Sequence, residues 1–566
     1  MHSIVKYIFL LIVINYHTAV ITQRYDFNWV FGYGGGMGNE RFGITKVDFI
    51  SGNPIQSIEL NIRQFLYDAN ASISNTEGRL MYYSNGYEVK DSNYLSIKDV
   101  LITGPKYWDA LIAQQGVMFL PLESVNASML FYIYLERVNG RFLITRINYI
   151  KIEGTNKIIE KGTLVSDTLN DGFLTACKHA NGRDWWLLLN KLNTNLYYNI
   201  LVQDDGSFKV DTFRSGPNII DGIGQAKFLN DGKLLAFYES ISDIIGATIY
   251  LFSFDRCSGK ISFIEDKPLV KKGIGGISFS PNSRYLYHSS GLILNKYEII
   301  NDRLDNLIQV DSITDQTLPW GSQFNQHQLG PDGRIYITNL YSNFYQHVIN
   351  KPDEPGLACD ARSNGFMLKT IARRGVSNNP NYRLGPIDDS ICDTLGINNI
   401  PWAWWRRDQD TSDHLNIEFT DLSAYEVTEW EWSFEDGRTS ISQNPIHRYS
   451  KKGTYEVCLI AKNKNGADTL CKILNLGVSN AVDKTVNIKI ELFPNPCDEY
   501  FVVNVLDYIP QRMILSLFDL NGKEVLTKRM YEGSNGIDVD QIHQGVYIVE
   551  VFESGKLVKV EKVIKM

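Results

Sequence analysis

Residues 225–240 read QAKFLNDGKLLAFYES, in which a tight Asn-Asp-Gly turn ending in Lys233 separates two strand-like segments. Asn and Asp before Gly tolerate the positive φ angles of a tight hairpin at little steric cost. Four other stretches repeat this arrangement, and their basic residues are Arg79, Arg183, Arg284 and Arg334. Successive basic residues are separated by 104, 50, 51 and 50 residues, so the chain carries an internal repeat.

The first interval spans two repeats, and residues 116–136 supply a degenerate copy in the gap. A period near 50 residues built from short strands is typical of a β-propeller with about four strands per blade. Residues 24–398 therefore predict a propeller of about seven blades, with six or eight left open. One period before the first repeat falls near Trp29 and one after the last falls near Arg383. The two ends are thus expected to share the seventh blade, which closes the ring and removes exposed strand edges.

The turns of the Pro-Asp-Gly kind resemble those of WD-repeat-like propellers of the TolB-like type. The stretches CKHANGRDWW (177–186), GLACDARSNG (356–365) and NYRLGPID (381–388) are similar to a group of large secreted proteins from Bacteroidetes bacteria. This resemblance covers most of residues 24–400. It implies a secreted propeller and brings no established chemistry with it.

The composition agrees with a folded, strand-rich chain. Of its 566 residues, 44% are hydrophobic and 12% aromatic, which is too apolar for a disordered protein. The net charge of −8 argues against a nucleic-acid partner, because phosphate recognition needs a clustered basic face.

The N-terminus predicts export. A short basic start precedes the unbroken apolar run YIFLLIVI at residues 7–14. A membrane-spanning helix needs about 20 apolar residues, so this run fits the core of a signal peptide. We expect residues 1–22 to be removed, and no later segment predicts a transmembrane span in the mature protein.

Export makes disulfides a better interpretation of the seven Cys than catalytic thiols. Cys458 and Cys471 flank a hairpin, and pairing residue 463 with 466 would place the two Cys opposite each other. A turn starting at residue 465 would instead separate them. The weaker candidate pairs are Cys359–Cys392 and Cys177–Cys257, which leave Cys497 unpaired.

Residues 402–478 contain FTDLS (419–423), WSFEDG (432–437) and NPIHRYSKKGTYEVCL (444–459). These motifs resemble a PKD domain, an immunoglobulin-like β-sandwich. Glu435 stands where the family usually has Gly. Trp430 and Trp432 alternate on one strand, so one of them is expected in the core. The resemblance implies a spacer or adhesion module.

Residues 483–566 predict a second small sandwich, so the expected fold class is all-β throughout. Phe493-Pro494-Asn495-Pro496, Asn521-Gly522-Lys523, Gly545-Val546-Tyr547 and the Lys-rich end resemble the C-terminal sorting domain of type IX secretion substrates. The resemblance implies the type IX secretion machinery as partner, followed by removal of the domain. The mature protein is then expected to be extracellular or on the outer-membrane surface.

Catalytic patterns such as GxSxG, HExxH and the P-loop do not occur in the sequence, so we assign no catalytic residue, metal or cofactor. His288 and His327 lie at similar positions of neighbouring repeats, but two dispersed His do not make a metal site. One cluster could bind a polar ligand at the mouth of the propeller, although a blade turn with core aromatics is favoured. Its members are His179, Arg183, Asp184, Trp185 and Trp186.

Two functions remain open. The favoured one is a non-catalytic binding or adhesion protein, in which the propeller binds a glycan or protein and the PKD domain is a spacer. The alternative is a secreted propeller enzyme acting on glycans or peptides. Propellers perform both roles, so the fold does not decide. Carboxylates or His converging on an open channel mouth would favour the enzyme.

Overall fold

The computed structural model consists of β-strands with two short 3₁₀ helices, Glu123–Val125 and Gly356–Cys359. The predicted signal peptide, residues 1–22, lies outside the described residues. The structure describes residues 23–34, 41–60, 62, 64–98, 113–154, 156–220, 223–240, 246–269, 273–314, 321–410, 413–476, 489–506, 513–519, 524–530, 533–553 and 556–566.

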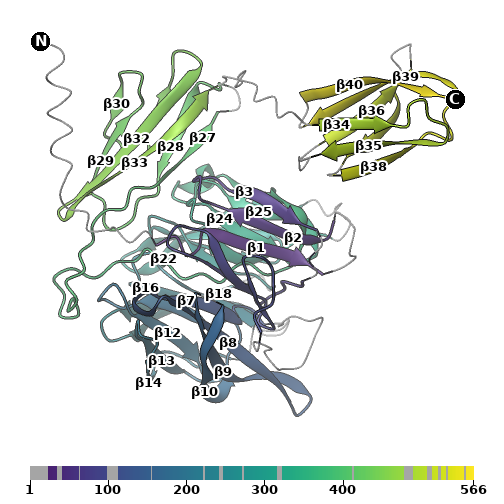
Figure 1. Ribbon diagram of the computed structural model, residues 1–566. Helices are drawn as coiled ribbons and strands as arrows, with labels where there is room; N and C mark the ends of the chain where they lie inside the picture. The colour runs from purple at the N-terminus through teal and green to yellow at the C-terminus, as the bar shows by residue number, and fades with distance from the viewer. Residues whose placement is uncertain are drawn as a thin grey trace, which may run out of the picture. The chain divides into compact units, whose positions relative to one another are not determined.

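Seven successive antiparallel sheets are described between Asn28 and Ala372, which confirms the seven-bladed propeller (Figure 1). The blades in chain order are β1 Asn28–Tyr33, β2 Gly43–Asp48 and β3 Ile55–Glu59; β4 Ala71–Ser74, β5 Leu80–Ser84 and β6 Val89–Asp91; β7 Val117–Leu122, β8 Ala127–Val138, β9 Arg141–Glu153 and β10 Lys157–Leu169; β11 Thr175–Lys178, β12 Trp185–Asn190, β13 Leu196–Val202 and β14 Phe208–Arg214; β15 Ile223–Phe228, β16 Leu234–Ser240, β17 Ala247–Asp255 and β18 Lys260–Leu269; β19 Ile277–Phe279, β20 Tyr285–Ser290, β21 Ile293–Ile300 and β22 Arg303–Ser312; β23 Phe324–Leu329, β24 Ile335–Asn339, β25 Asn343–Ile349 and β26 Ala361–Ala372.

The first strands of neighbouring blades contact one another, as β4 does β7 and β15 does β19, so these strands line the centre. We label the strands of a blade a to d from the centre outward. The repeated turns found in the sequence join strands a and b. Gly182, Gly232 and Gly333 in these turns have φ angles of 74°, 77° and 76°, which only Gly adopts without strain. The hairpin chemistry that predicted the repeat is therefore present in the fold.

Because consecutive strands of a blade are antiparallel, the a–b and c–d turns share one face of the ring, here called the a–b face. The b–c turns lie on the opposite face, the b–c face. Contacts between turns support this division. Asn230 of one a–b turn donates to the carbonyl oxygen of Ser280 in the next, and Ala180 donates its N–H to Arg256 in a c–d turn.

The first blade has three strands and lacks an inner strand of its own. Its strand β1 runs opposite to the neighbouring a strand β4, because Tyr25 just before β1 accepts a hydrogen bond from Ser74 at the end of β4. β1 is therefore a b strand. Residues 375–382 take the vacant inner place without forming a strand, so the two ends do meet in one blade, as the repeat spacing predicted.

A chain of apolar clusters closes the ring. Neighbouring blades share buried side chains around the circle, and the seventh blade joins the first through Tyr336 and Val348 packed with Trp29 and Phe49. The first blade joins the second through Val30 and Tyr83 among others. Burial between blades, rather than within one sheet, therefore holds the circle together.

The region predicted as a PKD domain is a two-sheet sandwich, as expected. One sheet has the order β27-β28-β31 and the other β30-β29-β32-β33. Trp432 is buried in this sandwich and Trp430 is half-buried, so one Trp of the alternating pair does face the core. The strands are β27 Trp405–Gln409, β28 Asn416–Asp421, β29 Glu429–Ser433, β30 Thr439–Ser440, β31 Ile446–Arg448, β32 Gly453–Asn463 and β33 Gly466–Leu476.

The C-terminal residues form a compact unit with its own core of Val, Leu, Ile and Met side chains. Its two sheets have the orders β34-β35-β38 and β37-β36-β39-β40, which confirms a second sandwich. In the part of the chain that the structure describes, we find no helix long and apolar enough to cross a membrane. The strands are β34 Lys489–Phe493, β35 Tyr500–Leu506, β36 Met513–Phe518, β37 Glu524–Arg529, β38 Gly533–Asp538, β39 Gly545–Glu553 and β40 Lys556–Lys565.

Candidate functional site

The five-residue cluster singled out in the sequence lies at the a–b turn of the fourth blade, between β11 and β12. Asp184 is buried, and its carboxylate accepts hydrogen bonds from Asn181 Nδ2 at 2.8 Å and Arg183 Nε at 3.0 Å. This bond to Asp184 raises the pKa of Arg183. Trp185 is fully buried in the blade core. These groups thus fix the turn and the blade beneath it.

His179 and Trp186 contact the next blade instead. His179 Nε2 lies 3.1 Å from the carbonyl oxygen of Cys257, and Trp186 Nε1 donates to the carbonyl oxygen of Arg256 at 2.8 Å. Burial lowers the pKa of His179, so its ring is neutral at pH 7. Both side chains therefore hold the β17–β18 turn. A ligand-binding role for the cluster stays a prediction, and its contacts favour the structural interpretation.

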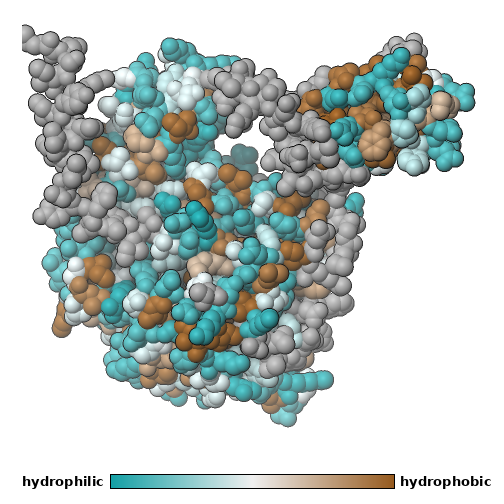
Figure 2. Space-filling view, viewed as in Figure 1, coloured by the Kyte–Doolittle hydropathy of each residue, from teal (hydrophilic) through white to brown (hydrophobic). Residues whose placement is uncertain are grey.

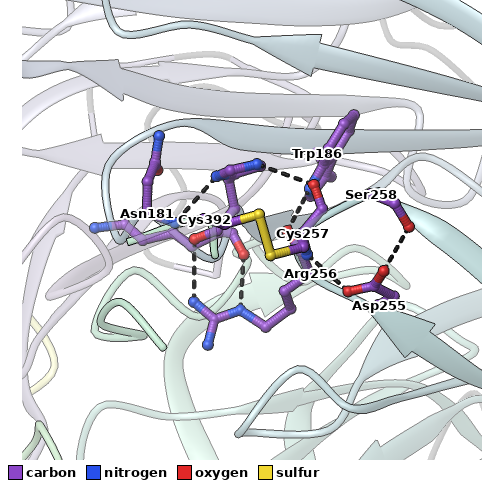
Figure 3. The surroundings of a disulfide bond; sticks show 9 residues. Asn181, Trp186, Asp255, Arg256, Cys257, Ser258 and Cys392 are labelled. Atoms are coloured by element: carbon purple, nitrogen blue, oxygen red, sulfur yellow. Dashed lines mark hydrogen bonds between the residues drawn. A yellow bond between two sulfur atoms is a disulfide. The ribbon is translucent and has the colours of Figure 1, made fainter. Parts of the chain in front are cut away.

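That turn carries a disulfide between Cys257 and Cys392, shown in Figure 3. The predicted pairs Cys359–Cys392 and Cys177–Cys257 are wrong, because Cys177 and Cys359 are free, buried thiols. Sequence spacing could not find the true pair, since 135 residues separate its members and only the ring brings them together. The Cys458–Cys471 disulfide is present as predicted, and Cys497 is free.

The channel of the propeller is filled by the chain itself. We call residues 373–392 the strap. It starts at the b–c face, where Arg374 donates its N–H to Asn339 at the end of β24. It leaves at the a–b face, where the N–H of Ile387 donates to Ala180. The strap therefore passes through the ring from one face to the other.

Asn378 is the centre of the strap and is almost fully buried. Its N–H donates to Asn70 at 2.8 Å, and its side-chain amide donates to the carbonyl oxygens of Val117 at 3.2 Å and Leu174 at 3.1 Å. Gln115 donates to its side-chain oxygen at 3.0 Å. One Asn thus satisfies backbone groups at the inner edges of the second, third and fourth blades.

Other amide side chains bridge the inner strands of further blades. Gln225 of the fifth blade accepts from the N–H groups of Ile277 and His327, at 3.0 Å each, and donates to the His327 carbonyl oxygen at 2.8 Å. Gln114 reaches Asn325 of the seventh blade. This buried network ties blades together across the centre and occupies space that a ligand would otherwise enter.

The exit of the strap is held by the N-terminal residues. The Arg383 guanidinium binds both carboxylate oxygens of Asp26, at 2.6 and 2.8 Å, and both side chains are largely buried. Tyr382 donates its hydroxyl to Phe119 at 2.9 Å and packs edge-on against Tyr25. The two ends of the propeller sequence are thus locked together at the a–b face.

A serine and a histidine form a pair that resembles a nucleophile and its base. Ser289 Oγ lies 2.8 Å from His327 Nε2, but both side chains have no exposed surface. Burial lowers the pKa of the nearby His288 to about 4 and of His347 to about 3, so these imidazoles are neutral. A pair that no substrate can reach is part of the core.

Among the described residues, no group of three or more His, Cys, Asp or Glu is arranged to hold a metal ion.

The predicted PKD sandwich packs onto the a–b face over the seventh and first blades. Arg334 of an a–b turn forms an ion pair with Asp408, and Lys351 of a c–d connection pairs with Glu418 at 2.7 Å. Trp402 and Trp404 join the apolar cluster around Phe27. The predicted spacer is therefore held against the propeller by both apolar and ionic contacts.

Lys472 lies in this interface. Its ammonium nitrogen is 4.1 Å from the centre of the Trp404 ring and donates to the carbonyl oxygen of Ser51 at 3.2 Å. Burial, together with the nearby Arg24 and Arg407, lowers the pKa of Lys472 to about 7.

Two families match parts of the chain. Residues 399–478 match the PKD domain family. Residues 491–566 match the secretion system C-terminal sorting domain. The second match identifies a substrate of type IX secretion, and the protein is therefore secreted or displayed on the cell surface.

Similarities to individual proteins are shorter or more distant. A stretch of 43 residues is 42% identical to the collagenase ColQ1 of Bacillus cereus strain Q1, covering 8% of this chain and 4% of that enzyme's length. The PKD1 domain of Epp from Vibrio anguillarum has 21% identity over 14% of this chain and 96% of that one, with a TM-score of 0.13. The Dos1 propeller has 10% identity over 64% of this chain and 91% of that one, with a TM-score of 0.36.

Proposed function

We propose that this protein is a non-catalytic binding or adhesion protein of the cell surface or secretome, and that its propeller binds through the b–c face. The observation that carries the proposal is the filled channel. The strap and the amide network occupy the place where propeller enzymes would need an open cavity, and the amides of Asn378, Gln115 and Gln225 are bonded to one another or to the blades.

The a–b face offers little room for a partner. The PKD domain lies over the seventh and first blades, as the ion pair of Arg334 with Asp408 indicates. The strap exit and its disulfide cover the fourth and fifth blades at Ala180 and Cys257. The N-terminal residues contact the third blade through Glu123, which accepts from the Tyr25 hydroxyl at 3.0 Å.

The b–c face carries a projecting hairpin. Strands β8 and β9 have 12 and 13 residues, against three to nine for the other b and c strands of the propeller, so their turn extends past the blade. The exposed side chains at its tip include Arg137, Val138, Arg141 and Phe142, with Asn139 in the turn between them. Cross-strand pairing puts Arg137 beside Phe142 and Val138 beside Arg141, so each face of the hairpin has one cation and one apolar group.

The distribution of surface residues fits specific binding better than nonspecific hydrophobic adsorption. On the propeller face seen in Figure 2, hydrophobic residues are scattered among hydrophilic ones. A localised basic and apolar tip on a chain of net charge −8 would favour an acidic glycan or protein.

The full-length secreted protein, probed on glycan and protein arrays, tests this proposal. We expect binding to at least one class of ligand and a loss of about tenfold or more from the double variant Arg141→Glu/Phe142→Ala. The matched control is Arg79→Glu, which changes an exposed Arg on the a–b face. Failure to bind every class, or turnover of a glycan or peptide by the same preparation, would contradict a binding role.

A further inference from the structure

The strap connects the first blade of the propeller, the central channel and the PKD domain. It fills the inner place of the first blade, crosses the channel and leads directly into the PKD domain. Its middle is anchored by hydrogen bonds, but its exit is also anchored by a covalent bond, the disulfide from Cys392 to Cys257. The covalent anchor therefore acts at the end where the strap could leave the ring.

We propose that the Cys257–Cys392 disulfide is an oxidation-dependent latch that locks the strap in the channel once the protein has left the reducing cytoplasm. Before oxidation, the strap is held by noncovalent contacts alone, among them its hydrogen bonds and the Arg383–Asp26 ion pair, and it can open locally. After oxidation, its exit is tied to the fifth blade, and local opening requires the a–b face of that blade to move as well.

The half of the latch on the blade is held in place by its neighbours. His179 and Trp186 bond the β17–β18 turn, and the Cys257 N–H donates to Asp255 at 2.9 Å. Arg256, next to Cys257, donates from Nε to the carbonyl oxygen of Lys178 at 2.9 Å and from its terminal nitrogen to that of Gly385. Arg256 therefore joins the blade turn to the strap beside the disulfide.

The half on the strap is held by the PKD side. Asn399 donates to the Asp388 carboxylate at 3.1 Å, and Asn465 of the β32–β33 turn donates to its other oxygen at 2.8 Å. The PKD hairpin thus positions the strap exit. Because the disulfide joins this exit to the fifth blade, it couples the packing of the PKD domain on the propeller to the closure of the ring.

Accessibility separates this disulfide from the free thiols. Cys257 and Cys392 are half-buried, so small oxidants and reductants can reach them. Cys177 and Cys359 are fully buried, and burial raises the pKa of each thiol, which disfavours the reactive thiolate.

The chemistry is ordinary thiol–disulfide exchange. The thiolate of one Cys attacks a disulfide oxidant and forms a mixed disulfide, releasing one thiol of that oxidant. The second Cys thiolate then attacks the protein sulfur and releases the other thiol. Two protein thiols are oxidised, and one disulfide of the oxidant is reduced to two thiols.

Hydrogen exchange of the intact chain tests the latch. Wild-type protein and Cys392→Ser are compared by mass spectrometry of peptides covering residues 375–388. We expect exchange there to be about tenfold faster or more in the variant, with the b strands of the blades unchanged. The matched control is Cys458→Ser/Cys471→Ser, which removes a disulfide spanning a separation of only 13 residues. This control should leave the exchange of the strap unchanged.

Mild reduction of folded wild-type protein gives the same comparison without mutation, should the variant not fold. Faster exchange confined to residues 375–388 after reduction, reversed by oxidised glutathione, supports the latch. Equal exchange of oxidised and reduced protein overturns it. So does an increase of the same size in the Cys458–Cys471 control.

Discussion

Individual buried side chains set the acid sensitivity of this protein. His288 is 2% exposed and has a pKa of about 4, whereas an unfolded His titrates near 6.5. The folded state keeps the ring neutral. The contribution of His288 to the free energy of unfolding is therefore unaffected above pH 6.5, and stability is lost below this pH as the unfolded chain takes up a proton. The full difference, roughly 2.5 pKa units, corresponds to about 3 kcal/mol by pH 4.

We therefore expect the urea midpoint of the wild type to fall as the pH decreases from 6.5 to 4. In His288→Leu this fall should be smaller, because one neutral buried imidazole has been removed. Measured unfolding curves at several pH values give the comparison. An identical pH dependence in the variant would show that other groups cause the acid sensitivity.

The Arg383–Asp26 pair is the ion pair that joins the strap to the N-terminus. Replacement by Met in Arg383→Met leaves a buried carboxylate unpaired, which should cost about 3–5 kcal/mol in urea unfolding. Arg284→Met is the matched control, since Arg284 binds Glu298 at the same kind of distance but is largely exposed. Its cost should be much smaller, because solvent screens the charges of an exposed ion pair. Equal costs for the two variants would argue against a role of Arg383 in holding the strap.

At the scale of elements, the strap replaces a strand. It forms no ladder, and side chains together with single backbone groups, such as the N–H of Asn378, satisfy the inner edges of neighbouring blades. Asn378→Ala should therefore cost about 2–4 kcal/mol, because the carbonyl oxygens of Val117 and Leu174 lose their donors. Asn381→Ala, which removes a bond donated to Asn230 and one accepted from the Arg383 N–H, should cost about 1–2 kcal/mol, less than Asn378→Ala because Asn381 is only half-buried. Chemical denaturation measures both, and a similar loss in each would contradict a central role for Asn378.

At the scale of the whole molecule, the propeller and the PKD domain depend on each other. Removing residues 399–566 would expose Phe27 and the apolar surface that Trp402 and Trp404 cover. We expect the protein ending at residue 398 to be about 3–5 kcal/mol less stable than one ending at residue 476. Thermal unfolding of the two secreted proteins tests this. Equal midpoints would show that the domain is an independent spacer after all.

The C-terminal domain determines destination. Deletion of residues 483–566 should leave the protein in the periplasm, because the sorting domain matched at residues 491–566 is the part that type IX secretion handles. Fractionation of cells followed by immunodetection makes the comparison with the intact chain. Unchanged surface display after the deletion would contradict the assignment.

The parts of the structure that depend on local chemistry were predictable from the residues alone. The positive-φ turns at Gly182, Gly232 and Gly333 repeat at a fixed interval, so they gave the blade period directly. The Cys458–Cys471 disulfide was predictable because its hairpin is local. The two C-terminal domains were predictable because short ordered motifs mark them.

The segment that fills the channel and the pairing of Cys257 with Cys392 depend on the closure of the ring. Cys257 and Cys392 are brought together by closure of the ring, and no local pattern reports a contact across 135 residues. The same closure places His179 and Trp186 of the predicted cluster against the turn that carries Cys257, while a ligand-binding role for the cluster stays a prediction. The repeat in the sequence arises from the hydrogen-bonded strands of each blade and the turns between them. The strap has no periodicity, because each of its residues meets a different blade.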